Sequence, residues 1–486
     1  MLPDSDKPAC RKTLGNVLSE SGHFDEIEIL LELPVIFSRD RYADFDKMPL
    51  SKTNMELVNL ETIKNALPES QLRHSGNWLF SPQPLALDKK TTKALTQLGH
   101  PLAQFQRASD SIYQRSAKGN LPAWIHHLLD AGKPDWMIEL QQSQALRETM
   151  PKVIRPDLIL TAKEGDENSN SFALTELDSV PGGMGITLWL SQFYADHGFD
   201  ILGGANGIRD GFQNLYPEQG GRVLVSDESD DYRPEMTWLT EQCENISIHR
   251  AETHDPTDKE ESIYRFFEWF DWQNISHVKK LAQSSHLTSP CKPHLEEKLW
   301  LALLWSPSLR GIWEKELRSN HLKRLREITP FGWVVDPAPL PPQGALPRLD
   351  VHSWDDVANF SQKERHLVLK ISGFSELAWG SRGVHIGHDM PGNEWRQQIE
   401  AATAAFNDQP RMMQEYHSGK IINHPYFDPD TGEQRMMSGR ARLCPYFFTD
   451  RDGHTSFGGC LATIVPADKK KIHGMKDGIL VPCCHE

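Results

Sequence analysis

Val153-Ile-Arg-Pro-Asp-Leu-Ile-Leu160 is an apolar run with polar residues at alternate positions, and Phe172-Ala-Leu-Thr-Glu-Leu-Asp-Ser-Val-Pro181 is a second run of this kind a few residues later. Alternation predicts two β-strands. The polar run between them, from Lys163 to Ser171, predicts a hairpin turn, because Gly, Asn, Asp and Ser favour turns. We therefore expect the two strands to pair as a hairpin.

The hairpin carries one guanidinium and three carboxylates. Alternation places Arg155 and Asp157 on one face of the first strand, and Glu176 and Asp178 on one face of the second. Like charges this close raise one another's pKa, and a divalent cation is the usual remedy. Oxygen ligands without His or Cys suit Mg²⁺ rather than zinc. The alternative interpretation is that Asp157 and Glu176 form a structural ion pair with Arg155.

Length and composition describe an ordinary globular protein. With 486 residues the chain is expected to form two or three domains. A formal charge of −15 argues against nucleic acid or an anionic membrane as the main partner. No apolar run is long enough to span a bilayer, and the first residues lack the core of a signal peptide. Seven cysteines without a CxxC pair indicate a cytoplasmic protein, and adjacent Cys483 and Cys484 are interpreted as thiols at a mobile end.

The pattern along the chain predicts four parts. They are a mainly helical region 1–150, the metal-binding strands 151–195, a Rossmann-like subdomain 196–290 and a nucleotide-binding region 291–486. Within the third part, a strand at Val223, a helix at Pro234–Cys243 and a strand at Ile246 alternate, without a GxGxxG fingerprint. The glycine-rich turn Pro181–Gly185 either presents backbone N–H groups to an anion or is a tight turn into the next helix.

A second set of motifs lies in the nucleotide-binding region. His366-Leu-Val-Leu-Lys370 predicts a buried strand that ends in a lysine, and Val384-His-Ile-Gly387 predicts the next strand. The segment Ser372–Gly383 between them is rich in glycine. This layout is typical of a flexible hairpin that covers phosphates, although the chain has no Walker-type loop. A charge at the end of an apolar strand favours a functional Lys370 over one at the rim.

Two further strands are expected in the same region. They are Arg411-Met-Met-Gln-Glu-Tyr416 and Gly439-Arg-Ala-Arg-Leu-Cys-Pro-Tyr-Phe447. Alternation places Arg440 and Arg442 on one face of the second strand. They either contact a substrate or form the exposed face of the strand, and the pattern favours neither.

In order and spacing, these motifs resemble those of the ATP-grasp superfamily, and more narrowly its circularly permuted branch that contains glutathionylspermidine synthase. The resemblance covers roughly residues 150–460. The matching motifs are Arg155-x-Asp157, Glu176-x-Asp178-x-x-Pro181, Lys298 at the start of a helix, and Lys370 before the glycine-rich loop. The run Ile263–Asp271 is similar to the family's connector between subdomains.

Three positions depart from the family pattern. Asp178 and Glu297 stand where the family has asparagines, and the loop Trp379-Gly-Ser-Arg-Gly383 replaces the family's R-E-G-A sequence. The hydrolytic half of the bifunctional family members is not recognisable in residues 1–150. The resemblance implies an α/β and α+β structure: a circularly permuted ATP-grasp fold with a Rossmann-like pre-ATP-grasp subdomain and a mainly helical N-terminal region.

The resemblance also implies an activity and a role for each motif. The activity is an ATP-dependent ligase that joins a small-molecule or peptide carboxylate to an amine through an acylphosphate. In the implied site, Asp157, Glu176 and Asp178 hold two Mg²⁺ ions; Lys298 and Lys370 bind phosphate oxygens; Gly373, Gly380, Ser381 and Gly383 cover the phosphates; Gln414 and Glu415 contact adenine; Arg155 stabilises the transferred phosphoryl group; and Arg440 or Arg442 holds the acceptor carboxylate or the acylphosphate.

Two other functions are kept as alternatives. One is a catalytically silent nucleotide-binding or scaffold protein with the same fold, and the other is a phosphotransferase that stops at a phosphorylated product. The acidic run Asp227–Asp231 and the net charge suggest a cationic amine as the nucleophile, although such a run is usually a solvated loop. The oligomeric state is not predicted.

Overall fold

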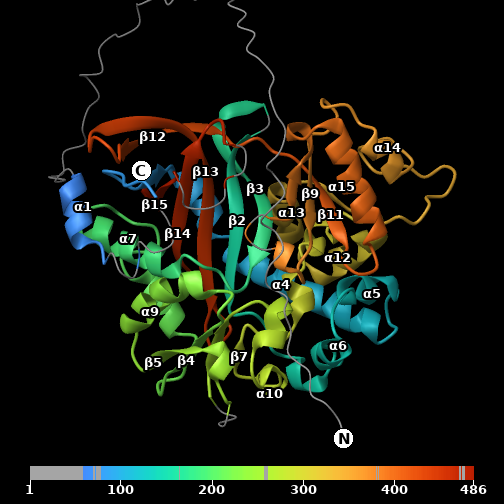
Figure 1. The fold of residues 1–486 in the computed structure, drawn as a ribbon, viewed down its shortest axis with the longest axis horizontal. Helices are drawn as coiled ribbons and strands as arrows, with labels where there is room; N and C mark the ends of the chain where they lie inside the picture. The colour runs from blue at the N-terminus through green and yellow to red at the C-terminus, as the bar shows by residue number, and fades with distance from the viewer. Residues whose placement is uncertain are drawn as a thin grey trace, which may run out of the picture. The chain divides into compact units, whose positions relative to one another are not determined.

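Three β-sheets form the framework of the described part of the chain (Figure 1). The computed structural model describes residues 58–68, 72, 78–163, 165–256, 261–378, 380, 382–469, 472 and 477–486, all of which belong to the unit Met55–Glu486. Helices and strands of both parallel and antiparallel sheets occur within this unit, so the fold is a mixed α/β structure. Every helix in these ranges is too short or too polar to cross a membrane.

The largest sheet has seven strands in the order β1-β15-β14-β13-β2-β3, with β12 paired to β13. Their bounds are β1 Leu85–Leu87, β2 Val153–Lys163, β3 Asp166–Asp178, β12 Ile421–Phe427, β13 Gln434–Thr449, β14 Thr455–Pro466 and β15 Ile479–His485. The predicted hairpin is present as antiparallel β2 and β3. Its turn is shorter than expected, because the polar residues from Asp166 onward continue the strand and pair back to Lys163.

The second sheet has the order β10-β9-β11-β8 and is antiparallel (Figure 1). Its strands are β8 Gly332–Val334, β9 Leu367–Ile371, β10 Val384–Ile386 and β11 Arg411–Glu415. The last three lie close to predicted strands, whereas β8 was not predicted. All five residues of β9 are buried. The sheet shares an apolar core with α14 (Trp354–Ala358) and α15 (Gly392–Ala404), which fixes the position of Lys370.

The third sheet is parallel, with the order β5-β4-β6-β7. Its strands are β4 Gly221–Val225, β5 Ile246–Arg250, β6 Ile263–Phe266 and β7 Leu287–Thr288, and α9 (Arg233–Glu241) connects β4 to β5. The predicted alternation of strand, helix and strand is therefore present. The chain leaves β4 toward β5 on one side and returns to β6 on the other. In such sheets ligands bind outside the carboxyl ends of the two central strands, here β4 and β6.

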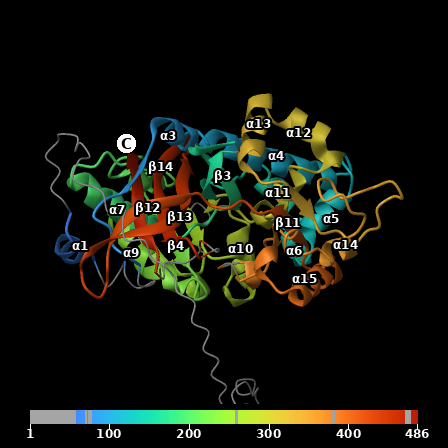
Figure 2. The same ribbon diagram turned by 90° about the horizontal axis from the view of Figure 1, so that it is seen from above.

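Helices cover these sheets. The described residues before β2, in the region expected to be mainly helical, hold α1 Leu60–Ala66, α3 Lys89–Thr96, α4 Gly99–Ala117, α5 Trp124–Asp130 and α6 Asp135–Gln141. Figure 2 shows the long α4 beside α12 and α13, with which it is in contact. The later helices are α7 Met184–Asp196, α8 Gly207–Gln213, α10 Val278–Ala282, α11 Leu299–Leu303, α12 Arg310–Glu316 and α13 Ser319–Ile328.

The C-terminal segment differs from its sequence interpretation. Cys483 and Cys484 are not at a mobile end: they belong to β15, and both are at most 5% exposed. β15 lies between β1 and β14. Its neighbour β14 directly precedes it in the chain, whereas its other neighbour, β1, comes from the far end of the described residues, and this pairing makes β15 an inner strand.

Candidate active site

A cavity of about 700 Å³ lies where the three sheets meet. The large sheet contributes residues of β2, β3 and β13, the second sheet contributes β9, β10 and β11, and the third contributes the segments that follow β4 and β6. Of the predicted site residues that the structure describes, all except Gly383 line this cavity. Gly383 is buried just outside, where its N–H donates to Leu377 O, and Ser381 lies outside the described residues.

Asp157 is held from two sides by guanidinium groups. One carboxylate oxygen accepts a hydrogen bond from Arg155 Nε at 2.9 Å, and the other accepts one from Arg442 Nη1 at 3.0 Å. The Cys444 thiol also donates to this carboxylate. Burial alone would raise the pKa of Asp157, but the two arginines hold it below its usual range. Two arginines therefore offset the charge of Asp157 and are oriented by it, although this charge still helps to raise the pKa of Asp178.

Asp178 and Glu176 lie opposite Arg155 and Asp157 in the hairpin register. Asp178 pairs with Arg155 Nη2 at 3.0 Å and accepts a hydrogen bond from the backbone N–H of Val180. Burial keeps the pKa of Asp178 above its usual range despite Arg155, and the charge of Glu176 adds to this. Arg155 thus pairs with Asp157, as the structural alternative expected, but also with Asp178, and Glu176 does not join them.

Glu176 pairs instead with Lys298, whose Nζ lies 3.3 Å from Glu176 Oε2. The other oxygen of Glu176 has no partner among the described residues, and its side chain is 33% exposed. Lys298 Nζ also donates to the backbone oxygens of Ala378 and Ser372 in the glycine-rich loop, at 3.1 and 3.3 Å. Lys298 therefore links the carboxylates of β3 to this loop and is not the solvated helix lysine of the alternative.

Glu297 anchors the start of the glycine-rich loop. Its carboxylate accepts a 2.7 Å hydrogen bond from the Gly373 N–H and one from the Ser372 hydroxyl. The other oxygen pairs with Lys133, which lies between α5 and α6. Glu297 and Lys133 are both less than 8% exposed. A residue of the mainly helical region thus supports the loop.

Lys370 connects the second sheet to the large sheet. Its Nζ donates to Gln414 Oε1 on β11 at 2.8 Å and to the backbone oxygen of Thr175 on β3 at 2.9 Å. The amide of Gln414 donates in turn to Leu174 O at 3.3 Å. Burial lowers the pKa of Lys370 to about 8, since only neutral groups contact the ammonium directly. A polyanion placed beside it would raise this pKa again.

Glu415 and Arg440 line the rim of the cavity. Arg348 Nη1 donates to both oxygens of Glu415, at 3.0 and 3.1 Å, and its guanidinium stacks on Phe331. Arg440 donates to the backbone oxygens of Gly419 and Ala467 and so fixes two segments of the chain. Arg442, by contrast, is turned to Asp157, so the two arginines do different things.

Two carboxylates of this region were missed by sequence reasoning. Glu268, just after β6, lines the cavity and has no hydrogen-bond or ion-pair partner among the described residues. Burial raises its pKa to about 7, and the charge of Asp178 contributes. The signal for it was an acid inside the aromatic run Phe266–Phe270, which the sequence analysis noted only as a connector.

Glu235 is the other one, on α9. Its carboxylate accepts hydrogen bonds from the N–H groups of Gly183 and Ile186, at 2.6 and 3.3 Å, and burial raises its pKa to about 7. These N–H groups begin α7, so a side chain already takes the place of an anion at this glycine-rich turn. The interpretation of Pro181–Gly185 as a tight turn is therefore the better one.

The donor set of the cavity suits a hard cation, because it consists of carboxylate oxygens. Glu176 offers an oxygen without a partner, whereas both oxygens of Asp157 and of Asp178 accept hydrogen bonds or pair with arginine. Glu176 would therefore be the first ligand to Mg²⁺, and the two aspartates would share their oxygens between the ion and Arg155 or Arg442.

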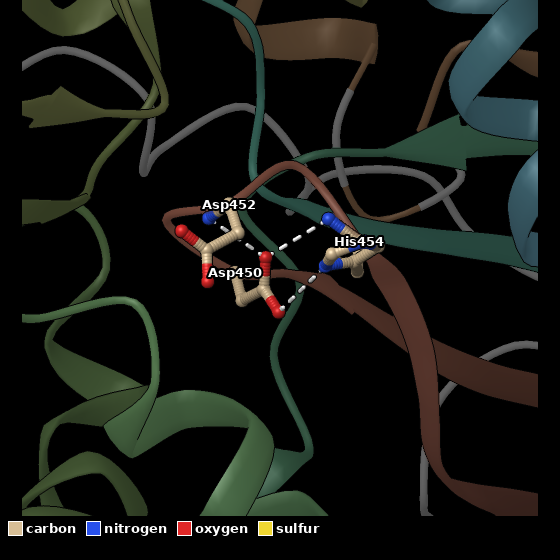
Figure 3. A group of neighbouring side chains, drawn as sticks. All are labelled: Asp450, Asp452 and His454. Carbon is tan, nitrogen blue, oxygen red and sulfur yellow. Dashed lines mark hydrogen bonds and ion pairs between the residues drawn. The ribbon is translucent and has the colours of Figure 1, made fainter.

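Among the described residues, a different group has three metal-binding side chains within 4.8 Å of one another, namely Asp450, Asp452 and His454 (Figure 3). They lie in the turn between β13 and β14. Asp450 Oδ1 accepts hydrogen bonds from the N–H groups of Asp452 and His454, both at 2.9 Å, and these bonds lower its pKa. The group is explained by the turn that it stabilises.

Comparisons with known proteins give likenesses among solved structures alone. No protein family matches the sequence in a scan of family models, and no curated protein matches it. A solved structure does: a glutathione synthetase-like effector (GSS30) from Globodera pallida, in its apo form. The TM-score is 0.50 at 12% sequence identity, over 89% of this chain and 99% of the other. At this identity the likeness extends to the fold alone.

Proposed function

We propose that this protein is an ATP-dependent ligase of the circularly permuted ATP-grasp type, which forms an amide bond between a carboxylate and an amine. The observation that carries the proposal is the convergence of two lysines, two paired arginines and three carboxylates on one cavity where three sheets meet. The likeness to a glutathione synthetase-like protein supports it at the level of the fold. The predicted division into four parts, 1–150, 151–195, 196–290 and 291–486, belongs to the same proposal.

The nucleotide would lie between the second sheet and the β2–β3 hairpin. Lys370 and Lys298 present two ammonium groups about the glycine-rich loop, where they would bind phosphate oxygens. The backbone N–H of Gly380 in the loop would face the phosphates, whereas that of Gly373 is held by Glu297. Gln414 and Glu415, on β11, would face the adenine. Mg²⁺ bound by Glu176 and Asp178, with Asp157 beside them, would offset the charge of the phosphates.

The reaction would have two steps. An oxygen of the acceptor carboxylate bonds to the γ-phosphorus, the bond to the bridging oxygen breaks, and ADP leaves with the electron pair. The amine nitrogen then bonds to the acyl carbon, the carbon–oxygen bond of the acylphosphate breaks, and phosphate and one proton are released. Arg155 and Arg442 are already oriented by Asp157, so they can stabilise charge on the transferred group without reorganising.

The amine would enter at the carboxyl ends of β4 and β6. Asp231 and Glu268 line this end of the cavity and have no partner among the described residues, and Tyr232, Phe267 and Phe270 accompany them. Carboxylates beside aromatic rings suit a cationic amine. Glu268, with a pKa of about 7, is suited to accept the proton that the attacking amine releases.

The test is turnover by the full chain with ATP, Mg²⁺ and pools of carboxylates and amines. The proposal expects ADP and free phosphate in equal amounts, with both pools required and an amide product in the mass spectrum. Binding of ATP without ADP release under any combination would favour the silent scaffold protein. Phosphate retained on the acceptor would favour the phosphotransferase.

The location and partners are part of the same proposal. The six cysteines in the described ranges are all free thiols, which suits a reducing cytoplasm. The expected partners are small molecules, and nucleic acid and membranes are not among them.

A further inference from the structure

A second groove, of about 810 Å³, lies apart from the candidate active site and shares none of its lining residues. One wall is a face of α4 that runs from Ala103 to Arg115. The other walls are the segment Arg147–Lys152, which leads into β2, and the turn between β13 and β14. No proposed step of the ligase reaction uses this groove.

The groove is basic although the chain as a whole is acidic. Six basic and three acidic side chains line it. The basic ones are Arg107, Arg115, Lys118, Arg147, Lys152 and Arg451. The three acids are all engaged: Asp110 with Lys292 and His294, Asp450 with the N–H groups of its own turn, and Glu148 beside Arg147. The cations that line the groove thus outnumber the acids by two to one.

Four of the six cations have no acidic partner. Arg115 pairs with Glu316 and Arg147 with Glu148. Among the described residues, no carboxylate pairs with the others, which are Arg107, Lys118, Lys152 and Arg451. The chain has a formal charge of −15, so most of its surface repels anions. Four unpaired cations around one groove make this groove a place that attracts an external anion.

Lys152 and Arg451 are held next to one another by the backbone. The N–H of Thr449 donates to Lys152 O at 2.7 Å, and Asp450 closes the turn that carries Arg451. Burial and the nearby Arg451 charge lower the pKa of Lys152, so the pair is not relieved by any anion of the chain. An anion between them would remove this repulsion.

Gln106 adds an independent observation on the opposite wall. It lines the groove and is only 4% exposed, yet its amide has no hydrogen-bond partner among the described residues. The amide is not among the fully buried polar atoms that lack a partner, so solvent reaches it and it can donate to a ligand in the groove. Ser111, five residues further along α4, also lines the groove and adds a hydroxyl.

We propose that this groove binds a small anion with several phosphate charges. Lys152 and Arg451 would bind one phosphate, Arg107 would approach from α4, and the Gln106 amide would donate to a phosphate oxygen. Arg107 is close enough, since its Nη2 lies 3.9 Å from the position that a Cβ would take on Gly453 in the same turn. A volume like that of the active-site cavity suits a nucleotide-sized ligand better than a polymer.

The test is calorimetric titration of the full chain with inorganic tripolyphosphate. Because the active site would also bind this probe, the titration is done in a Lys370→Met background as well as in the unchanged protein. The groove variant is Lys152→Ser with Arg451→Ser, and Gln106→Leu is a second variant that keeps the size of the side chain. The matched control removes the same charges at exposed positions, with Lys323→Ser and Arg310→Ser.

The expected result is a site that survives Lys370→Met and whose Kd rises about tenfold or more in the groove variant, with the control unchanged. Gln106→Leu should weaken it by a smaller factor, and thermal unfolding should show that all variants fold. ADP in a parallel titration would show whether a nucleoside improves on the bare phosphates. Equal binding by the groove variant and the control would overturn the proposal, and so would binding of an acidic peptide or RNA without any binding of tripolyphosphate.

Discussion

The two ends of the active-site cavity treat their charges in opposite ways. At the end formed by β2, β3 and β9, each charged group has a partner: Asp157 binds two arginines, Glu176 binds Lys298, and Lys370 binds Gln414. At the end formed by β4 and β6, Asp231 and Glu268 have none among the described residues. In the proposed reaction, the first end binds the phosphates of ATP, which are the same in every turnover, so its groups gain from being oriented in advance. The second end receives the amine, so its carboxylates remain open to it.

The largest effect is expected at the paired end, at the carboxylate that retains a free oxygen. Glu176→Ala should reduce Mg²⁺-dependent turnover by about a thousandfold or more, because it removes both a metal ligand and the partner of Lys298. Asp178→Ala should also abolish turnover. Rates measured at saturating ATP, with circular dichroism to show folding, would check this. Unchanged rates in both variants would contradict the metal assignment. They would also contradict the proposed difference between the two ends of the cavity.

The next effect concerns the lysine that joins two sheets. Lys370→Met should weaken nucleotide binding by about a hundredfold, since a buried ammonium that faces the phosphates is lost. A fluorescent ATP analogue measures the Kd. Lys363→Met, at an exposed position, is the matched control. If both variants bind alike, the second sheet does not form the nucleotide side.

The open end is tested by Glu268→Gln. Because the pKa of Glu268 is about 7, a cationic amine should bind better as the pH rises from 6 to 8, and Glu268→Gln should remove this trend and raise the KM of the amine by about tenfold. Arg265, Lys298, Glu176 and Asp178 are the charges that act on Glu268. Initial rates across this pH range give the KM. If the pH trend persists in the variant, a group other than Glu268 causes it.

The stability of the same variant is an independent control. A carboxyl whose pKa is raised in the folded state binds more protons there than in the unfolded chain, so stability falls as the pH rises from about 4.5 to about 7. Glu268→Gln should remove its share of this loss. Glu235 also has a pKa of about 7 and contributes equally to both proteins, so the difference between their unfolding curves isolates Glu268.

The smallest effect on activity is expected at Glu297, which does not line the cavity but holds the glycine-rich loop at the paired end. Glu297→Gln should raise the KM for ATP a few-fold and leave kcat nearly unchanged, because the loop keeps an acceptor for Gly373. Stability should fall by about 3 kcal/mol or more, since Lys133 is left buried without a counter-charge. Adding Lys133→Met should recover much of this loss in denaturant unfolding. A double variant as unstable as the single one would show that the pair is unimportant.

The sequence predicted the elements that depend on local patterns. The β2–β3 hairpin, the register face of Arg155 and Asp157, and the strand that ends at Lys370 all follow from alternation within a few residues. Resemblance to a family then placed nearly all of the chosen residues around one cavity, although their roles stay predictions. The sequence did not indicate Glu268 or Glu235 as site residues, because the residues next to them in the chain do not reveal which distant segments they face in the fold.

What the sequence determined by itself was which residues share a strand, a turn or a helix face, since these relations are set by backbone geometry over a few bonds. Only the tertiary structure decided that Arg442, 285 positions after Asp157, neutralises it, and that β15 with Cys483 is an inner strand. It also decided that the lysine supporting the glycine-rich loop comes from the helical region before β2. These pairings depend on which distant segments bury their apolar faces together, and this is a property of the whole packed chain.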